Sequence, residues 1–318
     1  MIPADYERGE WDEDELAYLL RICPRPCPPG TLGIPPAFFG VGFGRRFLFP
    51  LQIFCRGEKM MLLNAFDPER NAIINPENCY APVPDFPETA VAVFSGKLFQ
   101  ALAQALGGRK IAENRDVDGA WPVYEVTYRG MRFAWCKGRL GAPACVGHFE
   151  EIIARGAKRI ILMGNCGVLD RNIPDCGIII PTFAFRDEGT SYHYCPSSDT
   201  IPVNRKYIPE FKKVLERAGY PFAEGGTWTT DAFYRETKAK MEARKAAGAI
   251  CVEMECAAMQ ALCDFRGVEF FQFLYAGDNL DHASWDPRSL GEFIKLEEKE
   301  KIVLLALELA YEIGRNGS

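Results

Sequence analysis

Apolar residues follow two alternating patterns from Thr89 to the end of the chain. Short runs, such as residues 90–94, are apolar at every position, which is typical of a strand covered on both faces. Between these runs lie segments like the one that carries Leu98, Leu102 and Leu106, where apolar residues recur every four positions. That spacing places them on one face of a helix. Alternating strands and helices predict an α/β fold whose helices cover both faces of a sheet.

Further elements follow from the same two patterns. Strands are expected at residues 123–128, 131–136, 159–163, 176–182 and 270–278, and the first two form a hairpin that turns at Arg129-Gly130. Helices are expected at residues 144–155, 207–218 and 290–313, and a glycine directly follows each of the first two. The strand at 270–278 delivers an aspartate, Asp278, at its tip.

Residues 1–85 lack this alternation and are rich in proline, above all at 23–36 and 67–87. Their apolar residues are too few for an independent core. We therefore expect two parts. Residues 1–85 form an N-terminal extension that packs on the main domain or on a neighbouring subunit, and residues 86–318 form one main domain.

The composition is that of an ordinary globular protein, with 48% apolar and 25% charged residues among 318. A net charge of −6 argues against a nucleic-acid partner, which would require a basic surface. The apolar runs are too short and too often interrupted by charge for a membrane-spanning helix, so we expect no membrane partner. The acidic start of the chain does not resemble a signal peptide, and we expect a cytoplasmic protein.

Twelve cysteines are scattered over the predicted strands and helices. Without an export signal, they are expected to be reduced and mostly buried thiols. Cys23 and Cys27 are close in sequence, but no second pair of Cys or His follows at zinc spacing, and the chain has only three histidines. We therefore predict no metal site.

Candidate chemistry gathers at the ends of three predicted strands. Val-Glu-Met-Glu at residues 252–255 stands where an apolar strand runs into an Ala-rich helix, and ligands bind at such strand ends in open α/β sheets. A carboxylate there can accept hydrogen bonds from a pair of sugar hydroxyls. The plainer alternative is that Glu253 and Glu255 only favour the start of the helix through its dipole. An aromatic pair, Phe233-Tyr234, and Asp278 follow two other strands, and this set predicts a base platform, a ribose clamp and a proton donor.

These ordered motifs resemble the nucleoside phosphorylase superfamily, which includes purine nucleoside phosphorylases, uridine phosphorylases and methylthioadenosine nucleosidases. The resemblance covers the chain from about residue 91 and includes a Gly-rich turn at 138–143, a central Gly-Asn-Cys-Gly loop at 164–167 and a segment at 187–194. It implies a three-layer α/β/α sandwich with a mixed central sheet. It also implies a homo-oligomer, either a dimer or a hexamer, in which residues 86–318 are the catalytic domain.

The resemblance implies roles for the acidic residues and their neighbours. Asp278 protonates N7 of a purine, Glu255 holds the ribose 2′- and 3′-hydroxyls, and Met254 packs under the sugar. His193 contacts the ribose or a subunit boundary, with a structural histidine as the alternative. For Asp278 the plainer alternative is a cap on the following turn, a common place for aspartate.

The base site implied by the resemblance has four residues. Phe233 stacks on the base with Tyr234 beside it, Gly167 lies in the central loop, and Glu253 has a supporting role. The plainer alternative for Phe233 is an ordinary core aromatic.

The phosphate site departs from the family pattern. The family builds it with one arginine after the first strand and another before the central loop, and here Gln100 and Leu162 occupy those positions. The residues left to bind phosphate are Gly96, Lys97, Arg139 and Asn165, with Lys137 as a further source of charge. The plainer alternative is that these lysines are solvated surface charges.

The expected function is phosphorolysis of purine nucleosides to the free base and ribose 1-phosphate, in nucleoside salvage. Phosphate is the co-substrate, and no cofactor is implied. The missing arginines keep open a phosphate-independent nucleosidase that uses water. A uridine phosphorylase-like activity and a non-catalytic nucleoside-binding protein are the further alternatives, and retention of Asp278 and Glu255 speaks against the last.

Overall fold

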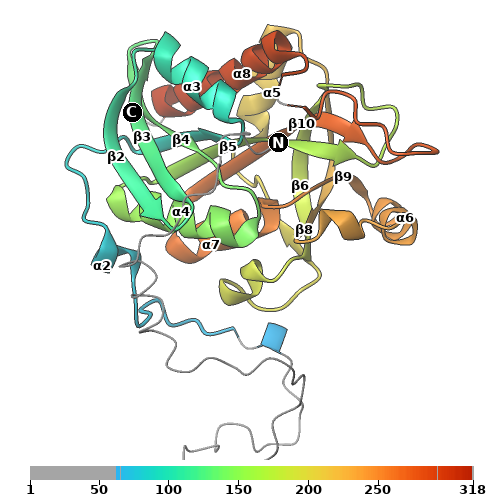
Figure 1. Cartoon of the computed structure of the whole chain (residues 1–318), viewed down its shortest axis with the longest axis horizontal. Coiled ribbons are helices and arrows are strands. Elements are labelled where there is room, and N and C mark those ends of the chain that lie inside the picture. Colours follow the sequence, from blue (N-terminus) through green and yellow to red (C-terminus); the bar gives the residue numbers. More distant parts are fainter. Residues whose placement is uncertain (1–61, 65, 292, 317–318) are drawn as a thin grey trace, which may run out of the picture. The chain divides into compact units, whose positions relative to one another are not determined.

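The computed structural model describes residues 62–64, 66–291 and 293–316 (Figure 1). Most of the expected extension at residues 1–85 lies outside these ranges. Its described end includes a short helix at residues 76–79, and Phe86, which directly follows the extension, is buried in the main core. The division of the chain at residue 85 stays a prediction.

Strands and helices alternate along most of the described chain. The strands are β1 Thr89–Val93, β2 Arg109–Asp116, β3 Gly119–Tyr128, β4 Met131–Lys137, β5 Arg159–Val168, β6 Ile178–Asp187, β7 Thr200–Pro202, β8 Phe222–Thr230, β9 Ala249–Glu253 and β10 Glu269–Asn279. The α-helices are α2 Pro76–Cys79, α3 Gly96–Ala105, α4 Ala142–Arg155, α5 Ile208–Ala218, α6 Lys238–Ala246, α7 Cys256–Arg266 and α8 Leu296–Asn316. Three short 3₁₀ helices are η1 Leu62–Asn64, η2 Thr190–His193 and η3 Phe233–Arg235.

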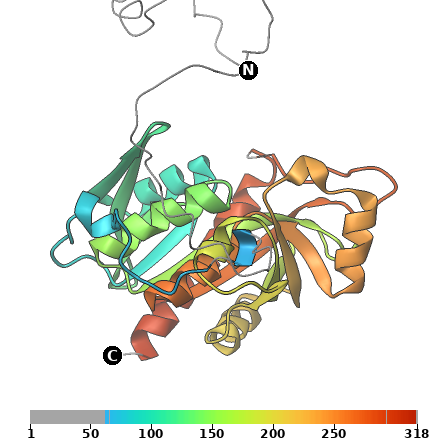
Figure 2. The ribbon, with the colours of Figure 1, turned by 90° about the horizontal axis from the view of Figure 1, so that it is seen from below.

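All described strands belong to one mixed sheet. Its strand order is β10-β6-β8-β9-β5-β1-β4-β3-β2, and β7 pairs with β6. Because β10 pairs with β5 as well as with β6, the strands β5, β10, β6, β8 and β9 close into a ring, and the other strands extend from it. In space, the β2–β3 hairpin lies on one side of this sheet and α6 on the opposite side (Figure 2).

Helices cover both faces of the sheet. Helices α3, α5 and α8 pack against one face, where Val91 and Val93 of β1 point, and helices α4 and α7 pack against the other, where Ala90 and Ala92 point. Figure 1 shows α3 and α8 on one side of the central strands and α4 and α7 on the other. Because successive side chains of β1 point to opposite faces of the sheet, this strand contributes to two separate apolar cores.

The predicted α/β class and mixed sheet are confirmed. The Arg129-Gly130 hairpin is also present, and both residues have the positive φ angles, 51° and 83°, that a two-residue type I′ turn requires. Closure of the sheet into a ring was not foreseen.

Three element predictions need correction. Residues 164–167 were expected in a loop but continue β5, because they pair with β10 on one side and reach β9 on the other. Strand β2 was missed, since its many charged residues hide any alternation. The last helix begins at Leu296 rather than at residue 290.

Within the described ranges, all cysteines are free thiols. The same ranges contain no group of three or more His, Cys, Asp or Glu side chains that could hold a metal ion. Nor does any described helix have the length and apolar character needed to cross a membrane.

Replacing Asn204 with alanine should strongly destabilise the fold. Its buried amide donates to the backbone oxygens of Pro181 and Gln272, at 2.8 and 2.6 Å, and accepts from the Gln272 N–H at 2.8 Å. Loss of three buried hydrogen bonds should lower the free energy of unfolding by about 3–5 kcal/mol in urea titrations. Asn172→Ala, on the surface, is the control. Equal effects of the two substitutions would contradict this account.

Candidate functional site

Strand β5 changes neighbours at the point where the candidate site lies. Its first half pairs with β1 as far as Val93 opposite Met163, and its end pairs with β9 where Gly167 faces Val252. Strand β10 runs beside it throughout. A change of strand order of this kind opens a crevice at the sheet edge, which is where α/β folds bind ligands.

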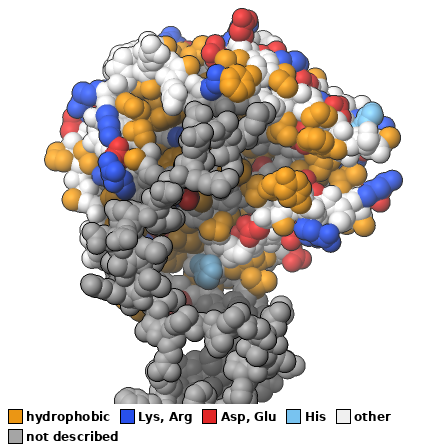
Figure 3. Space-filling view, in the orientation of Figure 1, with side chains coloured by type: hydrophobic (Ala, Val, Ile, Leu, Met, Phe, Trp, Pro, Cys, Tyr) orange, Lys and Arg blue, Asp and Glu red, His pale blue; other side chains and the backbone are white. Residues whose placement is uncertain are grey.

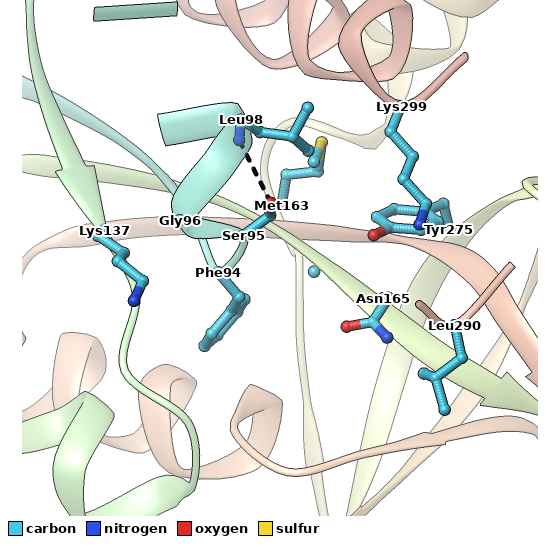
Figure 4. A pocket seen from close by; sticks show the side chains of 11 residues that line it. Phe94, Ser95, Gly96, Leu98, Lys137, Met163, Asn165, Tyr275, Leu290 and Lys299 are labelled. Atoms are coloured by element: carbon cyan, nitrogen blue, oxygen red, sulfur yellow. Dashed lines mark hydrogen bonds between the residues drawn. The ribbon is translucent and has the colours of Figure 1, made fainter. Parts of the chain in front are cut away.

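A cavity of about 340 Å³ opens beside β5 between these two stretches (Figure 4). The loop after β1, the end of β4, the middle of β5, strand β10 and the start of α8 contribute to its wall. Its polar lining residues include Ser95, Gly96, Lys137, Asn165, Tyr275 and Lys299. The strands β1, β4, β5 and β10 run parallel, so their carboxyl ends lie at the same edge of the sheet.

Two lysines reach this cavity from opposite sides (Figure 4). Lys137 ends β4, and Lys299 lies in the first turn of α8. Lys299 is only 2% exposed, and its ammonium group donates to the backbone oxygens of Ser289 and Gly291 at 2.7 and 2.8 Å. Helix α3 also begins at the cavity, with Ser95 as its N-cap. Two ammonium groups and a helix N-terminus together favour an anion.

The four residues predicted for phosphate separate into two pairs. Gly96 and Asn165 line the cavity. Lys97 and Arg139 do not: the Lys97 ammonium lies 3.7 Å from the centre of the Phe293 ring, and Arg139 forms ion pairs with two aspartates at the β2–β3 turn. Their assignment to phosphate stays a prediction.

No arginine is among the residues that line this cavity in the described part of the chain. Gln100 is exposed on α3, and Leu162 is fully buried in the core beneath α4 and α7. Lys299 was not foreseen as a lining residue. The sequence contains one indication that Lys299 is buried. It stands three residues before Ile302, which places both residues on the buried face of the last helix.

Glu253 is anchored by four donors at the start of α7. The backbone N–H groups of Glu255 and Cys256 both donate to it at 2.7 Å, and the hydroxyls of Thr229 and Thr227 donate at 2.6 and 3.3 Å. Burial raises the pKa of Glu253, while these hydrogen bonds lower it. A carboxyl group with so many protein partners has little capacity left for a ligand.

Glu255 has a different environment two residues further on. Its carboxyl group is buried and accepts a hydrogen bond, at 2.5 Å, from the backbone of Gly141 in the Gly-rich turn. Burial, and then the neighbouring Glu253, raise the pKa of Glu255 to about 8. Met254, between the two glutamates, is half-buried. Of the two glutamates, Glu255 therefore has more acceptor capacity for a ligand's hydroxyl groups.

Asp278 lies near the end of β10 and pairs with β5, which pairs with β9 on its other side. A bulge between Ala276 and Asp278 brings Asp278 opposite Gly167 of β5. A Cβ atom at Gly167 would lie 3.1 Å from Oδ1 of Asp278 and 3.2 Å from Val252. Burial raises the pKa of Asp278, whereas a hydrogen bond from the Trp285 indole N–H, 2.7 Å from Oδ2, lowers it.

The remaining predicted residues lie at the surface. Phe233 and Tyr234 form η3 after β8, with 46% and 89% of their surfaces exposed and ring centres 4.1 Å apart. The alternative of a core aromatic is therefore wrong for Phe233. His193 ends η2 and lines a second cavity of about 470 Å³ with Thr190 and Asp231. Figure 3 shows Lys and Arg side chains exposed on the side of the molecule where Figure 1 places α6.

Replacing Glu255 with glutamine should weaken the pH dependence of stability. Because the pKa of Glu255 rises from 4.5 to about 8 on folding, the folded state holds more protons than the unfolded state between these values. Its contribution to stability is therefore lost as the pH rises through this window. Urea unfolding at several pH values should show a smaller loss for Glu255→Gln than for the wild type. Glu242→Gln, on exposed α6, should behave like the wild type, and an unchanged slope for Glu255→Gln would contradict the assignment.

Known proteins share both the sequence pattern and the fold. A purine nucleoside phosphorylase of the DeoD type from Bacillus cytotoxicus is 26% identical over 188 residues, which are 58% of this chain and 77% of that protein. The purine nucleoside phosphorylase of Plasmodium vivax is 26% identical over 209 residues, which are 64% of this chain and 82% of that protein.

Two solved structures share the fold at lower identity. Purine nucleoside phosphorylase from Toxoplasma gondii, in complex with immucillin-H, gives a TM-score of 0.63 at 20% identity, over 73% of this chain and 93% of that one. Uridine phosphorylase from Vibrio fischeri gives 0.61 at 19% identity, over 72% and 94%. The model of the family described as "Phosphorylase superfamily" matches residues 88–310. The match spans most of the chain, which therefore belongs to the phosphorylase superfamily.

Proposed function

We propose that this pentosyltransferase cleaves the N-glycosidic bond of purine nucleosides by phosphorolysis, releasing the free base and ribose 1-phosphate. The observation that carries the proposal is Asp278, a buried carboxyl group at a strand end whose pKa is raised by burial. A carboxyl group with a raised pKa can donate a proton to N7, so that the purine leaves as a neutral base. The proposal includes a homo-oligomeric, cytoplasmic enzyme of nucleoside salvage that needs no cofactor besides phosphate.

As the base leaves, positive charge develops on the ribose, and the enzyme must also stabilise this charge. Glu255 accepts hydrogen bonds from the ribose hydroxyls in this proposal, with Met254 under the sugar and His193 towards its outer side. Stabilisation of charge that appears only in the transition state is what lowers the barrier. Phe233 and Tyr234 close over the base, which suits their exposed position beside the site.

Phosphate enters the cavity beside β5 in this proposal. The N-terminus of α3 at Gly96, the amide of Asn165 and the ammonium groups of Lys137 and Lys299 provide donors and positive charge there. A lysine supplies charge without the fixed two-pronged geometry of an arginine. We therefore expect this site to hold phosphate in a less strictly fixed orientation than a site built from arginines.

Hydrolysis is the second candidate, and the absence of arginine among the described lining residues favours it. Water would then attack the ribose and the product would be free ribose. Uridine is a weaker candidate substrate, because a pyrimidine has no N7 to accept the proton of Asp278. A protein that only binds nucleosides would have no use for a buried acid at this position.

Base release measured with and without phosphate tests the proposal. The protein is incubated with inosine, adenosine, guanosine and uridine, and the free base and the sugar product are quantified. Release of purine bases that requires phosphate and yields ribose 1-phosphate is expected. Free ribose without phosphate would establish the hydrolase instead. Uridine as the best substrate would refute the purine assignment, and binding without turnover would refute catalysis.

Lys137→Met tests the phosphate cavity within the same assay. Loss of one ammonium group should raise the KM for phosphate about tenfold or more, with a much smaller change in the KM for the nucleoside. Lys110→Met, at an exposed position of β2, is the matched control. An unchanged KM for phosphate would remove Lys137 from the site.

Asp278→Asn should lower kcat for purine nucleosides by about 10²–10⁴-fold, since an amide cannot supply the proton. Thermal unfolding of the variant should show that it is folded. The effect should be larger at low pH, where Asp278 of the wild type is protonated. A wild-type kcat in this variant would exclude Asp278 as the acid.

A further inference from the structure

Trp285 combines an exposed ring with a buried hydrogen bond. Its side chain is 61% exposed, yet its indole N–H points inward and donates to Oδ2 of Asp278 at 2.7 Å. Asp278 itself is only 9% exposed. The tryptophan thus places a fixed donor on one oxygen of the buried carboxyl group.

The backbone holds Trp285 in this place. The next residue, Asp286, forms an isolated β-bridge with Asn279, in which the Asn279 N–H donates to the Asp286 oxygen at 2.8 Å and the Asp286 N–H donates to the Asn279 oxygen at 3.2 Å. Asn279 directly follows Asp278. The bridge therefore ties the position of the indole to the position of the carboxyl group and closes the loop between them.

The loop is also held from outside. Asp281 accepts hydrogen bonds from the Arg171 side chain at 3.2 Å and from the Lys245 ammonium at 2.7 Å. Its backbone N–H donates to the side-chain oxygen of Asn279 at 2.9 Å. These contacts connect the loop to α6 and to the turn after β5, so the position of Trp285 does not depend on the bridge alone.

The two oxygens of Asp278 consequently differ. Oδ2 accepts the indole N–H, whereas Oδ1 lies on the side of Gly167, 3.1 Å from the position that a Cβ atom of this residue would take. A protonated carboxyl group carries its hydrogen on one oxygen. A hydrogen on Oδ2 would leave the indole N–H with a hydroxyl oxygen, a weaker acceptor than a carbonyl oxygen, whereas a hydrogen on Oδ1 leaves it with the carbonyl oxygen.

We propose that Trp285 is a positioning residue that keeps Oδ2 of Asp278 as an acceptor and thereby leaves the transferable proton on Oδ1. The proposal rests on the proposed function, in which Asp278 is the acid that protonates the leaving purine. It adds to that function a reason why one oxygen of the carboxyl group delivers the proton.

The same hydrogen bond favours the proton transfer itself. As the bond between C1′ and N9 breaks, its electron pair stays with the base, the proton moves from Oδ1 to N7, and a phosphate oxygen bonds to C1′. Asp278 is left as a carboxylate and later regains a proton from solvent. A hydrogen bond to a charged acceptor is stronger than one to a neutral acceptor, so the indole N–H stabilises the state that forms during the reaction.

Other charged groups also act on Asp278. Burial raises its pKa and so does Asp286, while the Trp285 hydrogen bond and the positive charge of Arg288 lower it. On the η3 side, burial and the charge of Asp278 raise the pKa of Glu236 to about 7. The thiol of Cys166 on β5 is buried and lies within the electrostatic influence of Asp278. Among these groups, only Trp285 donates a hydrogen bond from outside the sheet, so its removal changes the acid without changing the other charges.

The pH dependence of kcat tests this role. Trp285→Phe keeps an aromatic ring over Asp278 but removes the donor. Loss of a donor to the carboxylate raises the pKa of Asp278. In the plot of kcat against pH, the limb on which activity falls at high pH should therefore move up by about one pH unit. The value of kcat below that limb should fall about tenfold. Trp285→Gln, which retains an N–H donor, should recover part of both effects. An unmoved limb, or equal behaviour of the two variants, would overturn the proposal.

A double-mutant cycle with Asp278→Asn provides the control. If Trp285 acts through the carboxyl group, Trp285→Phe should change kcat by less than about twofold in the Asp278→Asn background. A full tenfold effect in that background would assign Trp285 to packing or to direct substrate contact instead.

A measurement on the free enzyme separates this proposal from the proposed function. The chain has five tryptophans, so its indole N–H signals in a ¹H–¹⁵N spectrum are few, and the Trp285 signal is the one that Trp285→Phe removes. This signal should shift with pH as Asp278 titrates, and the shift should vanish in Asp278→Asn. A signal that does not titrate would overturn the proposal even in an active enzyme. If the signal titrates but the wild type releases no base, the proposed function fails and the hydrogen bond stands.

Discussion

The pairing of β5 with three neighbouring strands is the constraint on which the site depends. Strand β10 follows β5 throughout, β1 leaves it after Met163, and β9 joins it at Gly167. The gap between β1 and β9 lies at the cavity, and on the other side of β5 the last paired residues hold Asp278 opposite Gly167. A shift of register by one residue would turn Asp278 to the other face of the sheet. The bulge before Asp278 is therefore part of the geometry that the chemistry requires.

Three buried carboxyl groups lie in this small region, and their hydrogen-bond partners distinguish them. Glu253 is surrounded by donors from the protein, so it anchors the start of α7. Glu255 accepts from the Gly141 backbone and Asp278 from the Trp285 indole, and both have fewer protein donors than Glu253. Burial raises the pKa of all three carboxyl groups. A substrate can form hydrogen bonds only with a carboxyl group whose oxygens are not already fully occupied by protein partners.

The sequence predicted those parts of the fold that local patterns determine. Apolar runs located the central strands, and the order of the motifs indicated the family. Strand β2 could not be found, because its residues are mostly charged and its stability comes from pairing with β3. The contact of Lys299 with the cavity and the hydrogen bond from Trp285 to Asp278 depend on how loops fold back on the sheet. Local periodicity carries no information on such contacts, so the residues that complete the site emerged only from the structure.

Closure of the sheet has a consequence for aggregation. Because β10 pairs on both sides, the strands of the ring offer no open edge there, and the long free edge of the described sheet is β2. That strand carries Arg109, Lys110, Glu113 and Arg115, and most of its residues are exposed or half-buried. Charged side chains along an edge oppose the addition of a foreign strand. Among the described strands, the charged residues that made β2 hard to recognise thus protect this long edge against pairing with strands of other molecules.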